Sequence, residues 1–173
     1  MEKPPTRWIK QMKIHCSHSE VKKLDELIAN PKNPNQHPRP QIELLAKILT
    51  HQGWRNPIVV SKRSGFITKG HARLEAAKLA GFNEAPIDLQ DYPNEAMEWA
   101  DMIADNAIAE LAHQPVDLVK NIALELGPDF DLDLLGIPDF KARYIDLEFV
   151  NDSPDDKEIK KTITCPECGF QIG

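Results

Sequence analysis

The stretch "ITKGHARLEAAKLAG", residues 67–81, joins a short β-branched run to an alanine-rich helical pattern at Gly70. His71 and Arg73 fall in the first turn of the predicted helix, which Gly81 ends. The amino end of a helix presents unpaired N–H groups and a partial positive charge, and it therefore attracts anions such as phosphates. Gly70 allows a phosphate to approach the backbone closely, and Arg73 can donate two hydrogen bonds to phosphate oxygens.

The two polar residues of this turn strengthen the phosphate interpretation. A cation in the first turn opposes the helix dipole, so Arg73 indicates a compensating anion. His71 can hydrogen-bond a phosphate or carry a proton near neutral pH, and it is the candidate catalytic residue, polarising water or phosphate. The alternative is an ordinary strand-to-helix turn with His71 and Arg73 on the surface, because Gly-His-x-Arg is too short to be specific.

Strands and helices alternate around this turn. The pattern predicts a helix over 40–53, a hairpin of strands at 56–62 and 66–69, a further strand at 85–92 and a long helix over 94–112. The fold class is therefore α/β (α+β), a small mixed sheet with packed helices. The spacing of five residues in the long helix predicts that they share its buried face: Met97, Ala100, Ile103 (or Ala104), Ala107 and Leu111.

Composition changes divide the chain into five segments. A segment "FDLDLLGIPDF", residues 130–140, is predicted to pack back onto the body as a short amphipathic helical turn. The segments are an extension at 1–20, the main domain at 21–114, a helical extension at 115–150, a charged linker at 151–164 and a cysteine-containing tail at 165–173.

Charge and hydrophobicity limit the class of protein. A hydrophobic content of 41% and a charged content of 28% are typical of soluble globular proteins. No apolar run approaches the roughly 18 residues of a membrane-spanning helix, and no apolar segment follows the first residues, so we expect a cytoplasmic protein with no membrane partner. The net charge of −6 argues against wrapping of DNA. Residues 55–78 are basic and 81–158 acidic, which indicates either a positive site with a negative flank or two differently solvated faces.

The tail contains the knuckle sequence Cys165-Pro-Glu-Cys168-Gly, whose two thiolates can bind one zinc ion. A structural zinc site needs four ligands. The candidates for the other two are Cys16 with His18, the neighbouring His15, or the same knuckle of a second subunit in a homodimer. The alternatives are a tail without metal or a remnant of a longer protein. A thioredoxin-like role is not expected, because the pair lies at a chain end and not at a helix start inside an α/β core.

Three sequence boxes, in order, resemble the N-terminal domain of the ParB/sulfiredoxin superfamily over residues 20–115. They are "NPKNPNQH" at 30–37, "RNPIVV" followed by the opening stretch at 55–81, and "ADNAIAEL" at 104–111. The chain is most similar to phage and prophage members that read Gly-His-x-Arg and are often joined to DNA methyltransferases. The resemblance implies a ParB/sulfiredoxin-like fold that binds a nucleotide between the helix of the second box and the helix of the third.

The resemblance also implies roles for individual residues. Asp105 would contact Mg²⁺, a cation that takes hard oxygen ligands, although a polar helix face is the alternative for Asp105 and Asn106. His37 either reaches the nucleotide or caps its loop. The predicted nucleotide- or phosphate-binding residues are Asn33, Asn56, Gly70, His71, Arg73 and Asn106.

The sequence differs from the family pattern at several positions, and these differences limit the functions that we expect. Partitioning proteins carry Gly-Glu-Arg-Arg where this chain has Gly-His-Ala-Arg, and sulfiredoxins need a cysteine at the position of His71. Residues 115–150 are acidic and do not supply a DNA-reading helix. We therefore expect a Mg²⁺-dependent nucleoside triphosphate-binding protein of a phage or mobile element, a candidate NTPase whose partner is DNA or a DNA-modifying enzyme. The alternatives are a DNA-binding adaptor without nucleotide chemistry and a metal-dependent nuclease.

Overall fold

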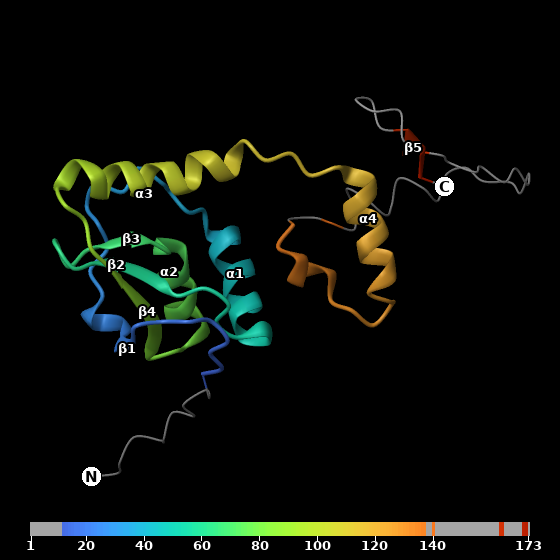
Figure 1. Cartoon of the computed structure of the whole chain (residues 1–173). Helices are drawn as coiled ribbons and strands as arrows, with labels where there is room; N and C mark the ends of the chain where they lie inside the picture. The colour runs from blue at the N-terminus through green and yellow to red at the C-terminus, as the bar shows by residue number, and fades with distance from the viewer. Residues whose placement is uncertain (1–11, 138–139, 141–162, 165–170, 173) are drawn as a thin grey trace, which may run out of the picture.

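A four-stranded mixed sheet lies at the centre of the part of the chain that the computed structural model describes, residues 12–137, 140, 163–164 and 171–172 (Figure 1). β1 (Glu20–Lys23) pairs with β4 (Glu84–Gln90) in antiparallel fashion. β4 pairs in parallel with β2 (Ile58–Ser61), which pairs antiparallel with β3 (Ile67–Lys69). The order is β1-β4-β2-β3, so the mixed sheet and the predicted hairpin are confirmed.

Two helices pack together and supply much of the core. α1 (Arg39–Gln52) ends at Gly53 and α2 (His71–Ala80) ends at Gly81, as the sequence predicts. The two helices contact each other along their length, and apolar side chains of both join the strands in one core. The largest side chains buried there are those of Trp54, Ile58, Ile67, Leu74 and Ile87.

α3 (Glu95–Glu110) runs beside β3 along one edge of the domain (Figure 1). Asn94 caps it, because its side chain accepts a hydrogen bond from the Met97 amide at 3.0 Å. The prediction of its buried face is wrong. All five residues expected inside are exposed, and Glu98 and Met102 are buried instead. The reason is that the hairpin presents hydroxyl and cationic groups to this helix.

The residues after α3 form a small extension beyond α1 (Figure 1). α4 (Val116–Glu125) is followed by a short 3-10 helix, η2 (Leu132–Leu135), which packs against α1. Lys47 of α1 pairs with Asp131 at 2.8 Å and with Asp133 at 2.6 Å. The expectation that this segment packs back onto the body is confirmed.

A short 3-10 helix follows β1, and a second, two-stranded sheet lies near the C-terminus. The 3-10 helix after β1 is η1 (Leu24–Glu26). β5 (Ile163–Thr164) and β6 (Gln171–Ile172) pair antiparallel, whereas Cys165 and Cys168 lie outside the described residues. None of the helices in the described ranges combines the length and apolarity needed to cross a membrane.

Candidate phosphate-binding site

The turn between β3 and α2 depends on a glycine. Gly70 has φ 94° and ψ 27°, a left-handed conformation that is costly for residues with a Cβ atom. A Cβ atom built there would lie 2.9 Å from Arg73 Nη1 and 3.4 Å from Ile58 Cα. The predicted strand–glycine–helix turn is present, and the amino end of α2 starts directly at it.

A cavity of about 220 Å³ lies beside this turn. It brings together five of the predicted site residues from α2 and α3, which are Gly70, His71, Arg73, Asp105 and Asn106. Its lining also includes residues that we did not predict, among them Asn35, Gln41, Thr68 and Lys69. His37 lies in the lining too, where it could reach a bound nucleotide. Lys69 could have been predicted from the sequence, because it is a cation directly before Gly70.

Arg73 lies partly buried against the back of the turn. Its Nη1 donates a hydrogen bond to the Pro57 carbonyl oxygen at 2.9 Å. Burial lowers the pKa of the guanidinium, although the nearby Asp105 carboxylate opposes this shift. One of its donors is thus occupied by the protein, and the remaining donors are those that a phosphate can use.

His71 is tied to the loop of the first box. Its Nε2 accepts a hydrogen bond from the Asn30 amide at 3.2 Å, so the neutral ring carries its proton on Nδ1. Burial lowers the pKa of His71, and the proximity of His37 lowers it further. At neutral pH this imidazole is therefore a hydrogen-bond donor through Nδ1, while Nε2 is already engaged.

Asp105 and Asn106 reach the cavity from α3. Asp105 Oδ1 lies 3.6 Å from Lys69 Nζ, which also pairs with Asp101 Oδ1 at 3.0 Å. Burial alone would lower the pKa of Lys69, but these two carboxylates raise it above its ordinary value. The Asn106 amide nitrogen donates to the Met102 carbonyl at 3.4 Å, which leaves the side-chain oxygen of Asn106 available as a ligand.

These residues would bind a magnesium ion only together with a bound phosphate. No three His, Cys, Asp or Glu side chains gather around a common point within the described ranges. Asp105 alone provides a carboxylate to the cavity, and it already faces Lys69. Since Mg²⁺ is commonly held by one or two carboxylates together with phosphates and water, the arrangement suits an ion that arrives with phosphate.

The other predicted ligands lie outside the cavity. Asn33 exchanges hydrogen bonds with the Asn35 backbone at 3.2 and 3.3 Å and so shapes the loop beside the cavity, whereas Asn56 is exposed and does not line it. Cys16 packs against the core, and burial raises its pKa, while the exposed His18 bonds through Nδ1 to the Cys16 carbonyl at 3.0 Å. With Cys165 and Cys168 outside the described residues, the zinc site stays a prediction.

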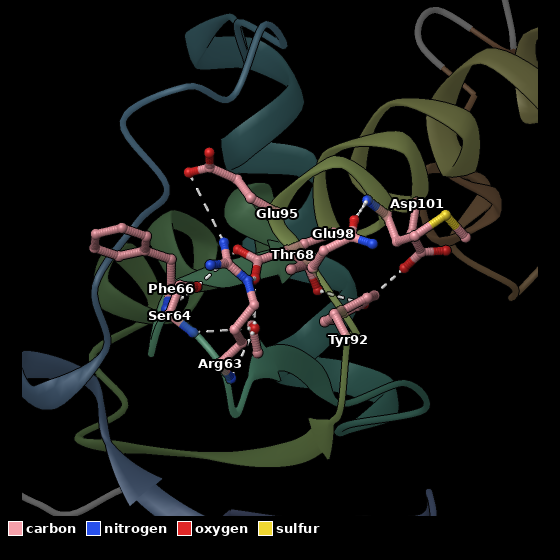
Figure 2. A network of polar contacts seen from close by, with 11 residues as sticks. Arg63, Ser64, Phe66, Thr68, Tyr92, Glu95, Glu98 and Asp101 are labelled. Carbon is pink, nitrogen blue, oxygen red and sulfur yellow. Dashed lines mark hydrogen bonds and ion pairs between the residues drawn. The ribbon is translucent and has the colours of Figure 1, made fainter.

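A chain of polar contacts joins Thr68, in the lining of the cavity, through Tyr92 to Asp101 of α3 (Figure 2). The Tyr92 hydroxyl donates to Asp101 Oδ2 at 2.7 Å and lies 3.3 Å from the Thr68 hydroxyl. Burial and the Asp101 carboxylate raise the pKa of Tyr92 to about 12, against the effect of Thr68. Because Asp101 also pairs with Lys69, Tyr92 orients a cation of the cavity without lining the cavity itself.

Comparison with solved structures finds ParB proteins that are similar to this chain. The C-terminally truncated chromosome-partitioning protein ParB from Caulobacter crescentus, complexed with CTP-gamma-S, is 23% identical with a TM-score of 0.50, over 62% of this chain and 63% of that one. The same protein complexed to the centromeric parS site is 23% identical with a TM-score of 0.44, over 57% and 51%. A Pnob8-like ParB-N domain is 18% identical with a TM-score of 0.43, over 64% and 46%.

The similarity covers less than two thirds of each of these proteins, and the likeness to the first, with its TM-score of 0.50, shows a shared fold. No curated protein matches the chain. The profile of the ParB N-terminal domain matches residues 10–107 of the 173, which include most of the three boxes and every described strand of the central sheet. The chain belongs to the ParB N-terminal domain family.

Proposed function

We propose that this protein binds a nucleoside triphosphate with Mg²⁺ in the cavity at the amino end of α2. The observation that carries the proposal is the left-handed Gly70, which opens the first turn of α2 onto a cavity that also contains Lys69, His71 and Arg73. The fold is shared with a partitioning protein whose structure contains CTP-gamma-S, which supports a nucleotide as the ligand. The Gly-His-x-Arg turn further supports a phage or mobile-element setting, with DNA or a DNA-modifying enzyme as the partner.

The charges of the cavity suit a phosphate chain. Lys69 and Arg73 are the cations of the lining, and Asp105 is its carboxylate. Phosphates bound here would accept hydrogen bonds from the free amides of α2 and from the remaining donors of Arg73. The Nδ1–H group of His71 would add a neutral donor.

The same groups define what chemistry the site supports. Mg²⁺ bound with the nucleotide would neutralise phosphate charge, and Asp105 and the Asn106 oxygen are the protein groups that would hold it. His71 would act by donating a hydrogen bond to a phosphate oxygen, because the Asn30 amide occupies the nitrogen that a general base would need. Nucleotide hydrolysis, where it occurs, would then rest on charge stabilisation and positioning.

The ion pairs of the basic stretch favour this function over a DNA-backbone adaptor. Arg63, Lys69 and Lys78 each pair with carboxylates of the same chain, and this lowers the positive potential available to DNA. A nuclease gains little support from Asp105 alone, since two-metal sites need several carboxylates.

Calorimetric titration with ATP, CTP and GTP, each with Mg²⁺, tests the proposal. We expect one of them to bind the wild type and to bind Arg73→Ala at least about tenfold more weakly, because a charge-assisted hydrogen bond is lost. Arg55→Ala, a change at an exposed arginine of the same stretch, is the matched control and should bind normally. No detectable binding of any of the three nucleotides, together with steeply salt-dependent DNA binding, would favour the DNA-binding adaptor. Plasmid nicking that EDTA and Asp105→Ala both abolish would favour the nuclease.

A further inference from the structure

The face of α3 that lies toward the sheet carries carboxylates. Glu98, Asp101 and Asp105 are spaced by three and four residues and therefore share one side of the helix. Their side chains are 1%, 35% and 49% exposed, in that order, so burial decreases along the helix toward the cavity. The helix is anchored at its most buried carboxylate, Glu98, and presents its most exposed one to the cavity.

Glu98 receives hydrogen bonds from three side chains of the hairpin. Ser61 Oγ donates to its Oε2 at 2.7 Å, and Ser64 Oγ donates to its Oε1 at 2.7 Å. Arg63 Nε lies 3.0 Å from Oε2, and Figure 2 shows the Arg63 and Glu98 side chains directed toward each other. Burial alone would raise the pKa of Glu98, but these donors lower it, so the carboxylate is charged at neutral pH.

The hairpin that holds Glu98 is itself fixed in shape. Ser61 Oγ accepts the backbone amides of Arg63 and Ser64 at 3.2 and 3.3 Å, which orders the turn between β2 and β3. β3 leads directly into Lys69 and Gly70 of the cavity. The hairpin therefore connects the anchor of α3 to Lys69 and to the glycine turn of the cavity through the three residues of β3.

We propose that Glu98 is a positioning residue, which holds α3 against the hairpin so that Asp105 and Asn106 face the cavity. Asp105 follows Glu98 by seven residues, which is two helical turns or about 10 Å along the axis, so a helix fixed at Glu98 is fixed at Asp105 as well. An apolar residue of similar volume would fill the space without the cost of burying a charge, but it would not specify the rotation of the helix. This inference rests on the nucleotide site proposed above.

Glu95 provides a matched control one turn away. It is a carboxylate of the same helix that approaches the same arginine, with 3.9 Å between Glu95 Oε1 and Arg63 Nη2, but its side chain is 57% exposed. Exposed pairs at such distances contribute little. Glu98→Gln and Glu95→Gln remove the same charge from the same helix, and only the first removes it from the buried anchor.

The test combines nucleotide titration with hydrogen exchange measured by mass spectrometry. The wild type is first titrated with CTP, ATP and GTP, each with Mg²⁺, to find the nucleotide that binds. For that nucleotide, Glu98→Gln should raise the dissociation constant by about tenfold, since the charge-assisted interaction between Glu98 and Arg63 is weakened. The amides of α3 should exchange at least about tenfold faster while those of α1 stay protected. Glu95→Gln should match the wild type in both. Arg63→Gln should reproduce the Glu98→Gln result, and the double variant should lose little more, because the two side chains act as one unit.

Two results would overturn the role of Glu98. One is normal nucleotide affinity with unchanged exchange of α3 in Glu98→Gln and in Arg63→Gln. The other is faster exchange that is uniform over α1, α2 and the sheet, which indicates a general loss of stability. If the wild type binds none of the three nucleotides, the proposed function fails by itself, and the exchange pattern of α3 still decides whether Glu98 positions this helix.

Discussion

Replacing Gly70 with alanine should damage both the fold and the site. At φ 94° the new residue would adopt a left-handed conformation, which costs about 1–2 kcal/mol for a residue with a Cβ atom. The Cβ atom would also lie 2.9 Å from Arg73 Nη1, so the guanidinium has to move away from the Pro57 carbonyl. Loss of that hydrogen bond adds roughly 1–2 kcal/mol. We therefore expect Gly70→Ala to lower the free energy of unfolding by about 2–4 kcal/mol.

Gly65→Ala is the matched control for this prediction. Gly65, in the turn between β2 and β3, has φ 75°, but a Cβ atom built there meets nothing within 4 Å. It should show the conformational cost alone, about 1–2 kcal/mol. Urea unfolding followed by circular dichroism measures both variants, and calorimetric titration measures nucleotide binding to each.

The two variants should differ most in nucleotide binding. Gly70→Ala displaces the guanidinium that we assign to phosphate, so its affinity should fall about tenfold or more, whereas Gly65→Ala should bind normally at a temperature where both are folded. Equal nucleotide affinity in the two variants would refute the reasoning, because the strain would then have no connection with the site. Equal stability would show that Arg73 moves without cost.

Three further predictions concern Tyr92, Glu98 and the cysteine tail. Tyr92→Phe should lower the free energy of unfolding by about 1–2 kcal/mol through loss of the hydrogen bond to Asp101, measured by thermal unfolding. In the wild type, Tyr92 should titrate near pH 12 by ultraviolet absorbance; because its folded pKa is raised, its contribution to stability is complete below the unfolded value near 10 and is lost as pH rises toward 12. Glu98 has a lowered pKa, so it stabilises the fold above its unfolded value near 4.3 and loses this effect as pH falls; acid unfolding should be less steep in Glu98→Gln. Metal analysis should find zinc in the wild type and none in Cys165→Ser or in Cys168→Ser. Absence of zinc from the wild type, with all three thiols of the chain free, would contradict zinc binding by the knuckle.

The turns and helix ends were predictable because each depends on local chemistry. Gly53 and Gly81 end helices through positive φ angles, and Asn94 caps α3 through its own side chain. The hairpin and the glycine turn at Gly70 follow from neighbouring residues in the same way. In each case the residues that decide the structure lie within a few positions of it.

The packing of α3 was not predictable from hydrophobic spacing. The rule that apolar residues face the core placed Met97 and Ile103 inside, yet they are 53% and 51% exposed. Glu98 takes the buried position because its hydrogen-bond donors come from a hairpin about 35 residues earlier in the chain. Such pairing depends on tertiary contacts that no local pattern records.

The same distinction between local sequence and distant contacts applies to the candidate site. Gly70, His71 and Arg73 were predicted from a single turn, and Asp105 and Asn106 from the family resemblance, and all five line one cavity. The bond between Asn30 and His71, which decides the tautomer of the imidazole, joins residues 41 positions apart and had no sequence signal. Asn56, also taken from the boxes, proved to be exposed outside the cavity.

Nuclear magnetic resonance of backbone amides during nucleotide titration tests the central claim most directly. With Mg²⁺ present, the amides of residues 70–73 should show the largest shifts as CTP, ATP or GTP is added, because the phosphates would accept hydrogen bonds from them. The side-chain amide of Asn106 should shift with them. Large shifts confined to residues away from this turn, or none with any of the three nucleotides, would contradict a phosphate site at the start of α2.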